Sequence, residues 1–375
     1  MPPALPTAPA APAATTATTA PLLNRRTLLG WGAGLGAGVV LGGASGCAWR
    51  GQGFDDGRGA PPTGSLSSDT GNPRVSQHEM EWVDARRDRA VPVRLYLPTD
   101  PAALSRPLPL MVFSHGIGGS RRGYSYLGHA AAENGWASLH LQHIGSDRSL
   151  WIGNPFTLVS RLNQAAQDSE AVARAHDLRF ALDQLLSDPQ FSARIDAQHI
   201  IAAGHSYGAN TSLLAAGASV TRGGRTLALR DDRLRGLVLL SAPPFYGEAH
   251  PETILGPVQL PSLHITTTDD EIVIPGYQSP PSDRVAVYQA TGSRNKALAV
   301  YKGGPHSVFT DRSTPGGTAL NADIKLATRE LLVCFLNCMQ QPTLPTVAPL
   351  QSSQFAPWES RHASLLAHFE LQQRG

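Results

Sequence analysis

Cysteine and charged side chains are scarce in this chain of 375 residues, which has 3 cysteines and 16% Asp, Glu, Lys and Arg. So few cysteines exclude a disulfide-rich scaffold and a cysteine-rich zinc module. Basic and acidic residues nearly balance, 31 against 29, so the chain has no strong positive footprint for nucleic acid. Apolar residues make up 41%, and the length allows one large or two ordinary domains. These features indicate a globular, enzyme-sized α/β or β protein.

The first 46 residues differ in composition from the rest. Residues 1–24 carry no charged side chain and consist largely of Pro, Ala and Thr, a composition that cannot bury a core. Arg25-Arg26 then precedes an uncharged, Gly-rich apolar run to Gly46, which resembles a twin-arginine export signal. Glycines interrupt this run throughout, which suits a signal better than a membrane span. We therefore predict a signal peptide over residues 1–46 and an exported bacterial envelope protein.

The end of this run, Ala44-Ser45-Gly46-Cys47, is similar to a bacterial lipobox, although Leu is the usual residue where Ala44 stands. Lipidation of Cys47 after cleavage would give a membrane-anchored periplasmic or outer-membrane lipoprotein. The alternative is ordinary cleavage nearby, with Cys47 lost or left as a free thiol. Residues 47–78 are rich in Gly, Ser, Pro and Asp and are predicted to form a flexible linker.

Predicted strands and helices alternate over residues 79–341, the predicted catalytic domain. This alternation predicts an α/β fold with a mostly parallel central sheet and helices on both faces, and two opening strands add an antiparallel edge. Residues 342–375 contain several prolines and are predicted to be a C-terminal extension with a short helix around Ala363–Leu371. The predicted strands are Met80–Arg86, Ala90–Leu97, Leu108–Ser114, Ala137–Gln142, His199–Ala203, Leu237–Ser241, Ser262–Thr266 and Ala297–Tyr301, and the predicted helices are Tyr124–Glu133, Ala171–Leu186, one through Thr211–Ala216, and Ala322–Met339.

A G-x-S-x-G motif, Gly204-His205-Ser206-Tyr207-Gly208, lies between a predicted strand and a predicted helix. In this context the motif is typical of a nucleophile elbow, a strained turn that exposes the serine hydroxyl at the carboxyl end of the sheet. The letters alone are common by chance in a Gly-rich chain, and the strand and helix around them make the motif specific. Ser206 is therefore the predicted nucleophile.

The predicted strand ending at Ser114 leads into His115-Gly116-Ile117-Gly118-Gly119-Ser120. This segment is similar to the H-G-x-G loops that complete an oxyanion hole. We predict that the backbone N–H groups of Ile117 and Tyr207 bind the developing oxyanion, where each donor stabilises the transition state by about 3–4 kcal/mol. A plain strand-to-helix turn is the alternative explanation for these glycines.

A serine hydroxyl is a poor nucleophile at neutral pH and needs a general base. The chain order that accompanies a nucleophile elbow is serine, acid, histidine. His306 follows Ser206 and lies in a loop just after a late predicted strand, so it is the predicted base. Two adjacent aspartates, Asp269 and Asp270, follow the preceding predicted strand, Ser262–Thr266. The frame Asp-x-x-Val-x-Pro favours Asp270 as the acid and leaves Asp269 as the alternative.

The segment from Ile144 to Glu170 carries more apolar surface than a solvated connection needs. Loops at the carboxyl end of such a sheet border the active site, so we predict a lid or the wall of an acyl pocket. The alternative is that these side chains only pack on the sheet edge. The predicted pocket residues are Trp151 and Phe156 from this segment, together with Phe245 and Tyr246 from a later loop.

These motifs resemble the α/β-hydrolase superfamily over most of residues 80–340. The segments Phe113–Arg121, Gly204–Gly208 and Gly304–Phe309 are similar to platelet-activating factor acetylhydrolase-like and dienelactone hydrolase-like enzymes. Acetylhydrolases of this kind take their acid from the loop after the strand that follows the nucleophile helix, but that loop, Leu240-Ser241-Ala242, has no carboxylate here. The dienelactone hydrolase pattern places the acid in the later loop, although those enzymes use a cysteine nucleophile where this chain has Ser206.

Motifs and resemblance together imply a serine hydrolase that cleaves carboxylic esters of short to medium acyl chains through Ser206, His306 and Asp270 and an acyl-enzyme. One alternative is a polyester or lipid hydrolase, acting on phospholipid or acetyl esters in a more open cleft. Another is a noncatalytic binding protein on a hydrolase fold. The expected partner is a small-molecule ester, with membrane contact through Cys47 and no nucleic acid. No cofactor and no metal are implied, and the oligomeric state is left open.

Overall fold

The computed structural model describes residues 73–245, 250–274, 277–312, 318–340 and 350–372. The predicted signal peptide, Cys47, most of the predicted linker and Tyr246 lie outside these residues. No helix in the described ranges is both long enough and apolar enough to cross a membrane.

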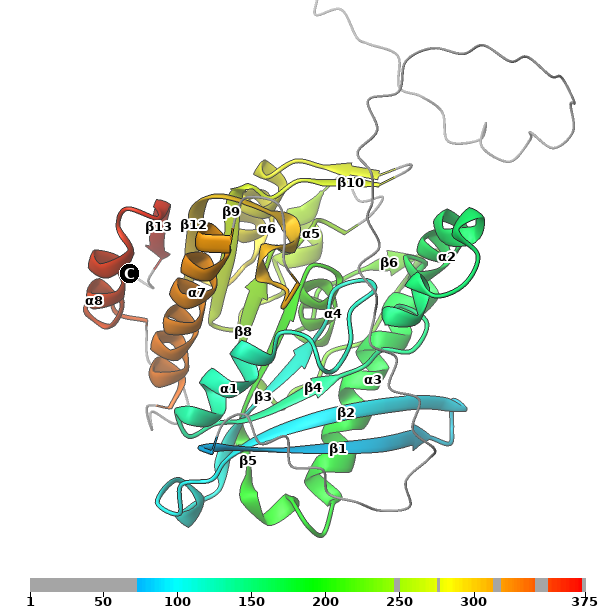
Figure 1. Ribbon diagram of the computed structural model, residues 1–375. Coiled ribbons are helices and arrows are strands. Elements are labelled where there is room, and N and C mark those ends of the chain that lie inside the picture. The colour runs from blue at the N-terminus through cyan, green and yellow to red at the C-terminus, as the bar shows by residue number, and fades with distance from the viewer. Residues whose placement is uncertain (1–72, 246–249, 275–276, 313–317, 341–349, 373–375) are drawn as a thin grey trace, which may run out of the picture. The chain divides into compact units, whose positions relative to one another are not determined.

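A nine-stranded sheet forms the centre of the fold, in the order β1-β2-β4-β3-β5-β8-β9-β12-β13 (Figure 1). The strands from β4 to β12 run parallel to one another, whereas β1 and β2 pair antiparallel with each other and β2 pairs antiparallel with β4. The prediction of a mostly parallel sheet with an antiparallel edge is confirmed. The strands are β1 Val75–Asp84, β2 Arg89–Pro98, β3 Leu108–Ser114, β4 Ala137–Leu141, β5 Ile195–His205, β8 Leu234–Leu240, β9 Ser262–Asp269, β12 Lys296–Pro305 and β13 Leu366–Gln372.

Helices cover both faces of the sheet (Figure 1). Alternation along β3 explains how both faces become apolar, because successive side chains of a strand point to opposite sides. Leu110 and Val112 pack in the core cluster with α3 and α4, while Met111 and Phe113 pack in the cluster with α1, α7 and α8. The helices are α1 Ser125–Glu133, α2 Leu158–Ala165, α3 Asp168–Ser187, α4 Tyr207–Ala215, α5 Pro251–Leu255, α6 Ser282–Ala290, α7 Thr318–Met339 and α8 Ser352–His362, and two small hairpins pair β6 Thr221–Arg222 with β7 Arg225–Thr226 and β10 Ile272–Ile274 with β11 Tyr277–Ser279.

The C-terminal segment belongs to the same fold rather than forming a separate extension. Phe355 and Trp358 of α8 are buried in the core cluster that contains α7, and β13 pairs antiparallel with β12. The predicted helix around Ala363–Leu371 is wrong, since most of these residues form β13. Phe369 and Leu371 alternate with more exposed residues along it, a period of two that fits a strand with one covered face.

Candidate active site

Ser206 lies at the turn between β5 and α4, at the carboxyl end of the parallel strands. Its backbone φ is 54°, in the left-handed region that residues with a side chain disfavour. Gly204 and Gly208 on either side of the serine must be glycines, because no side chain fits at either position. A Cβ on Gly204 would lie 2.2 Å from the carbonyl oxygen of Gly208, and a Cβ on Gly208 would lie 1.9 Å from the carbonyl oxygen of Ser114. The chain therefore has the strained strand–turn–helix geometry that its G-x-S-x-G motif predicts.

The fold brings Ser206, His306 and Asp270 into contact. His306 directly follows β12 and Asp270 directly follows β9, and these two strands are neighbours in the sheet. Ser206 Oγ lies 2.8 Å from His306 Nε2, and His306 Nδ1 lies 2.6 Å from Asp270 Oδ1. With Nδ1–H donating to the carboxylate, the Nε2 lone pair faces the serine hydroxyl and can accept its proton. The three side chains are thus arranged for attack by the serine oxygen.

Asp270 is held by buried polar partners. Its side chain is fully buried, and Thr266 Oγ1 donates to its Oδ2 at 2.7 Å. The buried guanidinium of Arg284, from α6, lies 3.4 Å from Oδ1. Burial alone would raise the pKa of Asp270, but the hydrogen bond and charge of His306 and the charge of Arg284 outweigh it and hold the pKa well below its ordinary value. Asp270 is therefore ionised at neutral pH.

Asp269, the alternative acid, lies in solvent. It is the exposed last residue of β9, and its carboxylate accepts a hydrogen bond from Thr268 Oγ1 at 3.0 Å. Successive side chains point to opposite sides along a strand, which explains why only one of the two adjacent aspartates can face His306. The structure brings Asp270 to His306 and does not bring Asp269 there.

The loop after β3 (residues 115–120, the predicted oxyanion loop) lies against the elbow. A Cβ on Gly116 would be only 3.3 Å from Ser206 Cβ. The amide of Gly118 donates to the Ser146 carbonyl at 2.8 Å, and that of Gly119 donates to the Gly116 carbonyl at 3.0 Å. Within the described part of the chain, the amides of Ile117 and Tyr207 have no backbone acceptor. Both amides predicted from sequence to bind the oxyanion are thus free of a backbone partner among the described residues.

A buried polar network beneath this loop was not predicted from the sequence. Arg174 of α3 is fully buried and donates to the His115 carbonyl, to Ser146 Oγ at 2.8 Å and to Thr211 Oγ1 at 2.9 Å. Its guanidinium also lies 4.5 Å from the centroid of the Tyr207 ring. Burial lowers the pKa of Arg174 to about 10, so the group keeps its charge at neutral pH. Arg174 therefore ties the oxyanion loop to the nucleophile helix α4.

His143 and Asp177 continue this network. His143 Nδ1 lies 3.0 Å from Asp177 Oδ2, and the His143 backbone amide donates to His115 Nε2 at 3.1 Å. Burial, with the charge of Arg174 adding to it, lowers the pKa of His143 to about 3, so its ring is neutral. The sequence does hold one signal for these groups. Arg174 precedes Leu178 by four residues, which places a charged side chain on the apolar face of the predicted helix.

Trp151 packs on the oxyanion loop. Its indole Nε1 donates to the Gly118 carbonyl at 2.9 Å, and a Cβ on Gly118 would lie 2.3 Å from that nitrogen. Arg312 donates to the same carbonyl at 3.1 Å and lies 5.8 Å from the Trp151 ring. Trp151 is 43% exposed. Trp151 thus borders the loop that carries Ile117 and stays partly exposed to solvent.

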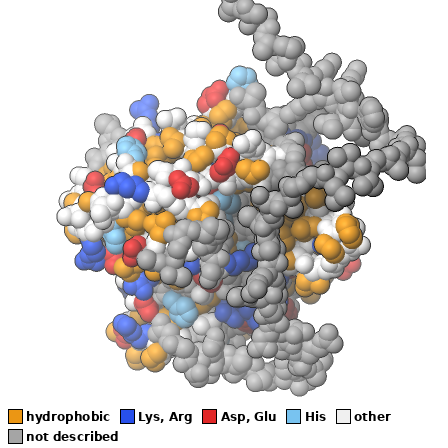
Figure 2. Space-filling model, turned by 45° about the horizontal axis from the view of Figure 1, so that its top comes forward, with side chains coloured by type: hydrophobic (Ala, Val, Ile, Leu, Met, Phe, Trp, Pro, Cys, Tyr) orange, Lys and Arg blue, Asp and Glu red, His pale blue; other side chains and the backbone are white. Residues whose placement is uncertain are grey.

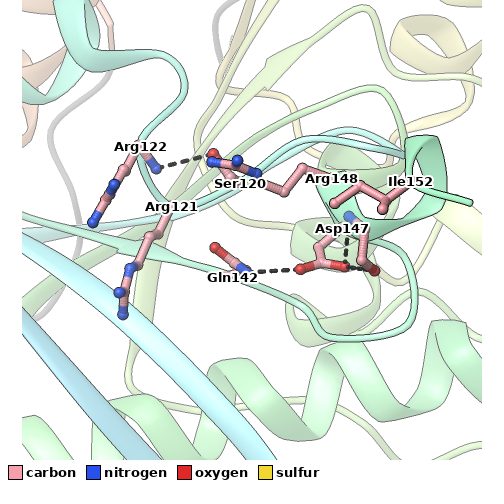
Figure 3. A pocket seen from close by; sticks show the side chains of 8 residues that line it. Ser120, Arg121, Arg122, Gln142, Asp147, Arg148 and Ile152 are labelled. Carbon is pink, nitrogen blue, oxygen red and sulfur yellow. Dashed lines mark hydrogen bonds between the residues drawn. The ribbon is translucent and has the colours of Figure 1, made fainter. Parts of the chain in front are cut away.

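A pocket of about 300 Å³ lies beside the same loop (Figure 3). Arg121 and Arg122 extend from the end of the loop, and Gln142 faces Asp147, to which it donates at 2.7 Å. The lining of this pocket includes none of the three residues in contact at the elbow. Its lining residues are Ser120, Arg121, Arg122, Gln142, Asp147, Arg148, Ser149 and Ile152.

Of the other predicted pocket residues, the structure describes Phe156 and Phe245, whereas Tyr246 lies outside the described residues. Phe156 is 93% exposed, and Phe245 is half-buried against the core cluster of α3 and α4. Hydrophobic side chains are also visible at the edge of the molecule where α2 lies (Figure 2).

The described residues contain no group of three or more His, Cys, Asp or Glu side chains that could hold a metal ion.

Comparisons with known proteins give one family match and a likeness to solved structures. The profile of the family "Platelet-activating factor acetylhydrolase, isoform II" matches residues 88–157, which include the oxyanion loop and Trp151. No curated protein sequence matches the chain. A ferulic acid esterase from Streptomyces cinnamoneus has a similar structure with a TM-score of 0.53 and 21% identity, over 77% of this chain and 97% of that one. A cold-adapted esterase from an Arctic intertidal metagenomic library has a TM-score of 0.47 and 16% identity, over 70% of this chain and 94% of that one.

The parallel sheet, the elbow and the fold shared with the Streptomyces enzyme agree with the family match. The chain has the α/β-hydrolase fold and is similar over residues 88–157 to the family "Platelet-activating factor acetylhydrolase, isoform II".

Proposed function

We propose that this α/β-hydrolase is a carboxylic ester hydrolase that uses Ser206 as nucleophile, His306 as general base and Asp270 as the residue that orients the base. The observation that carries the proposal is the unbroken pair of hydrogen bonds, 2.8 Å from Ser206 to His306 and 2.6 Å from His306 to Asp270. The acetylhydrolase match and the esterase fold support an ester as the bond that is cleaved.

In this mechanism Ser206 Oγ attacks the ester carbonyl carbon while its proton passes to His306 Nε2. The carbonyl oxygen becomes an oxyanion that the amides of Ile117 and Tyr207 bind. The bond to the alcohol oxygen then breaks, and His306 returns the proton to the leaving alcohol. Water attacks the acyl-enzyme with His306 again as base, which releases the acid and restores Ser206. Asp270 stays ionised throughout and stabilises the imidazolium.

The proposed substrates are esters of short to medium acyl chains. Trp151 supports this, because its indole lies on the loop that carries Ile117 and presents an apolar surface there. An acyl chain packed on this surface would gain up to about 0.8 kcal/mol for each methylene removed from water. Long-chain triglycerides should be poor substrates, since the described segment around Trp151 is short.

A second candidate is a lipid or polyester hydrolase that works at an open cleft. The specific observation in its favour is apolar exposure near Trp151, with Ile152 68%, Phe156 93% and Val159 44% exposed. Such side chains can contact an insoluble substrate. Comparing hydrolysis of soluble short-chain esters with that of dispersed phospholipid and polyester particles separates the two candidates, because only the second predicts a preference for the dispersed phase.

A fluorophosphonate probe tests the proposed nucleophile. Wild-type protein should be labelled, and Ser206→Ala should not. Protein that stays unlabelled, and that hydrolyses no member of an ester library, would instead support a noncatalytic binding protein on this fold. An ester library screened with unlabelled wild-type protein would then identify the acyl and alcohol groups.

We further propose that the protein is exported and lipid-anchored through Cys47. The support is Arg25-Arg26 before a Gly-rich apolar run and the lipobox-like end of that run. Two or more acyl chains would anchor the protein stably, whereas one holds only weakly. Metabolic labelling with a palmitate analogue should label the wild type and not Cys47→Ser. Unlabelled soluble protein in the periplasm would contradict the anchor and leave export standing.

A further inference from the structure

A chain of buried hydrogen bonds joins the oxyanion loop to the backbone of His306. The amide of Gly116 donates to the Tyr124 hydroxyl at 3.3 Å, and this hydroxyl lies 2.8 Å from His205 Nδ1. His205 Nε2 in turn lies 2.9 Å from the carbonyl oxygen of His306. Tyr124 and His205 are both buried, 3% exposed each. His205 directly precedes Ser206 in the elbow, so this chain runs beside the reacting groups without containing them.

The direction of each hydrogen bond follows from the chemistry of its partners. A carbonyl oxygen only accepts, so His205 Nε2 must carry the hydrogen that it gives to His306. Burial, with the charge of His306 adding to it, lowers the pKa of His205 to about 3, so its ring is neutral and Nδ1 has a lone pair. Tyr124 therefore donates its hydroxyl hydrogen to Nδ1, and its oxygen accepts from Gly116. Every link has one donor and one acceptor.

The backbone around these groups shows that the contact is tightly specified. Tyr124 has φ = 60°, an unfavourable left-handed conformation for a residue with a large side chain. That conformation begins α1 and leaves the tyrosine ring 4.8 Å from the ring of Phe113. A Cβ on Gly116 would lie 3.0 Å from His205 Nδ1, so the loop and the elbow touch with no space between them. The hydroxyl of Tyr124 thus sits at the junction of loop, elbow and base.

We propose that Tyr124 and His205 are positioning residues that hold the oxyanion loop and the general base in one fixed arrangement. This inference rests on the proposed ester hydrolase function. The bond to Gly116 fixes the peptide unit between His115 and Gly116. This unit directly precedes the one that carries the Ile117 amide, so fixing it restricts the direction in which that amide points. The bond to the His306 carbonyl fixes the backbone from which the imidazole reaches Ser206. Both must be in place together, because the oxyanion and the imidazolium form in the same step.

The neutrality of His205 is part of the same arrangement. Its ring centroid lies 4.9 Å from that of His306, which gains a positive charge when Ser206 attacks. A second cation at this separation would oppose that charge. A neutral histidine that donates through Nε2 holds the base without this penalty, which an arginine or lysine at the same position could not do.

Three variants separate the links of this chain. Tyr124→Phe removes the hydroxyl alone. His205→Gln keeps an N–H donor near the position of Nε2, whereas His205→Asn keeps polar atoms near Nδ1 but is too short to reach His306. We expect Tyr124→Phe to lower kcat about tenfold, equivalent to about 1.4 kcal/mol, with KM within about twofold. His205→Asn should lower kcat by about a hundredfold and His205→Gln by only about tenfold.

The effects of the Tyr124 and His205 variants on kcat should also be coupled. His205→Gln has no acceptor where Nδ1 stood, so adding Tyr124→Phe to it should lower kcat little further. The control is Tyr288→Phe, which removes a buried tyrosine hydroxyl that donates to Glu370 at 3.1 Å, far along the chain from the elbow. Each kcat is divided by the concentration of sites titrated with the fluorophosphonate probe, so that loss of folded protein is not counted as loss of rate.

The outcomes distinguish this inference from the function on which it rests. If Tyr124→Phe lowers the melting temperature or the number of titrated sites but keeps the wild-type kcat per site, the two residues are merely structural and the proposal is overturned. Equal kcat values for His205→Gln and His205→Asn would overturn the assigned link to His306. If the wild type behaves like Ser206→Ala with both probe and esters, the ester hydrolase function itself fails, and the inference fails with it.

Discussion

Replacement of Asp270 by Asn tests the proposed acid most directly. Asp270 is fully buried, accepts from His306 Nδ1 at 2.6 Å and from Thr266 Oγ1 at 2.7 Å, and lies beside the Arg284 guanidinium. An amide is similar in size, so the cavity stays filled. It removes the negative charge, however, and its NH₂ group can donate to Nδ1. His306 would then carry its hydrogen on Nε2, where it faces Ser206 and cannot accept the serine proton.

The expected magnitude follows from this change of tautomer. We expect Asp270→Asn to lower kcat by roughly 10⁴, which corresponds to about 5.4 kcal/mol of transition-state stabilisation. Asp269→Asn is the matched control, because the same change is made one residue away on an exposed carboxylate that accepts a hydrogen bond from its neighbour Thr268. It should change kcat by less than about threefold.

The assay is steady-state hydrolysis of p-nitrophenyl esters at neutral pH, with the folded fraction checked by circular dichroism. If Asp269→Asn were the damaging variant, the contact between Asp270 and His306 would not be the functional one. If both variants kept wild-type rates, the acid would have to lie elsewhere and the proposed mechanism would be refuted.

Three further predictions concern the acyl surface, the buried histidines and the elbow. Trp151→Ala should flatten the dependence of activity on acyl chain length more than it lowers acetate turnover, and a wild-type profile that falls steadily beyond acetate would contradict an acyl-binding role. Burial, with the charge of Lys296 adding to it, lowers the pKa of His264 to about 3. As pH falls below about 6.5, His264 therefore becomes protonated in the unfolded chain but stays neutral in the folded protein. The free energy of unfolding should therefore decrease as pH is lowered from about 6.5 toward 3, by up to about 1.4 kcal/mol per pH unit for each such histidine. Denaturant titrations at several pH values should show that the free energy of unfolding of His264→Asn depends less steeply on pH than that of the wild type. Gly208→Ala should abolish fluorophosphonate labelling, because its Cβ would lie 1.9 Å from the Ser114 carbonyl oxygen, whereas Gly123→Ala meets nothing closer than 3.4 Å and should be labelled like the wild type.

The fold and the three contacting residues could be predicted because their signals are local. Strands such as β3 are continuous apolar runs, and the elbow needs small residues on both sides of Ser206 whatever the rest of the chain does. The choice between Asp269 and Asp270 was harder, since it depends on the register at the end of β9. Only the frame of residues after the aspartates favoured one of them.

What could not be predicted depends on residues distant in sequence. The place of Arg174 on the apolar face of the predicted helix is a signal of its burial, but its partner at His115 and the partner of Asp177 at His143 become visible only when α3 packs beneath the loop at His115. The C-terminal segment differs from its prediction for a related reason. Its prolines indicated an extension, but the edge of β12 offers it a partner, and pairing with a neighbouring strand overrides local propensity.

The closure of the sheet by β13 has a consequence for shortened versions of the protein. A chain ended at residue 341, the boundary suggested by composition, would lose β13 and with it the hydrogen-bonding partner along one side of β12. It would also uncover the surface of α7 on which Phe355 and Trp358 pack. An unpaired strand edge beside fresh apolar surface is a template for association between copies. Such a fragment should retain every residue of the proposed active site and still precipitate, so insolubility of a trimmed protein would report on this edge rather than on the site.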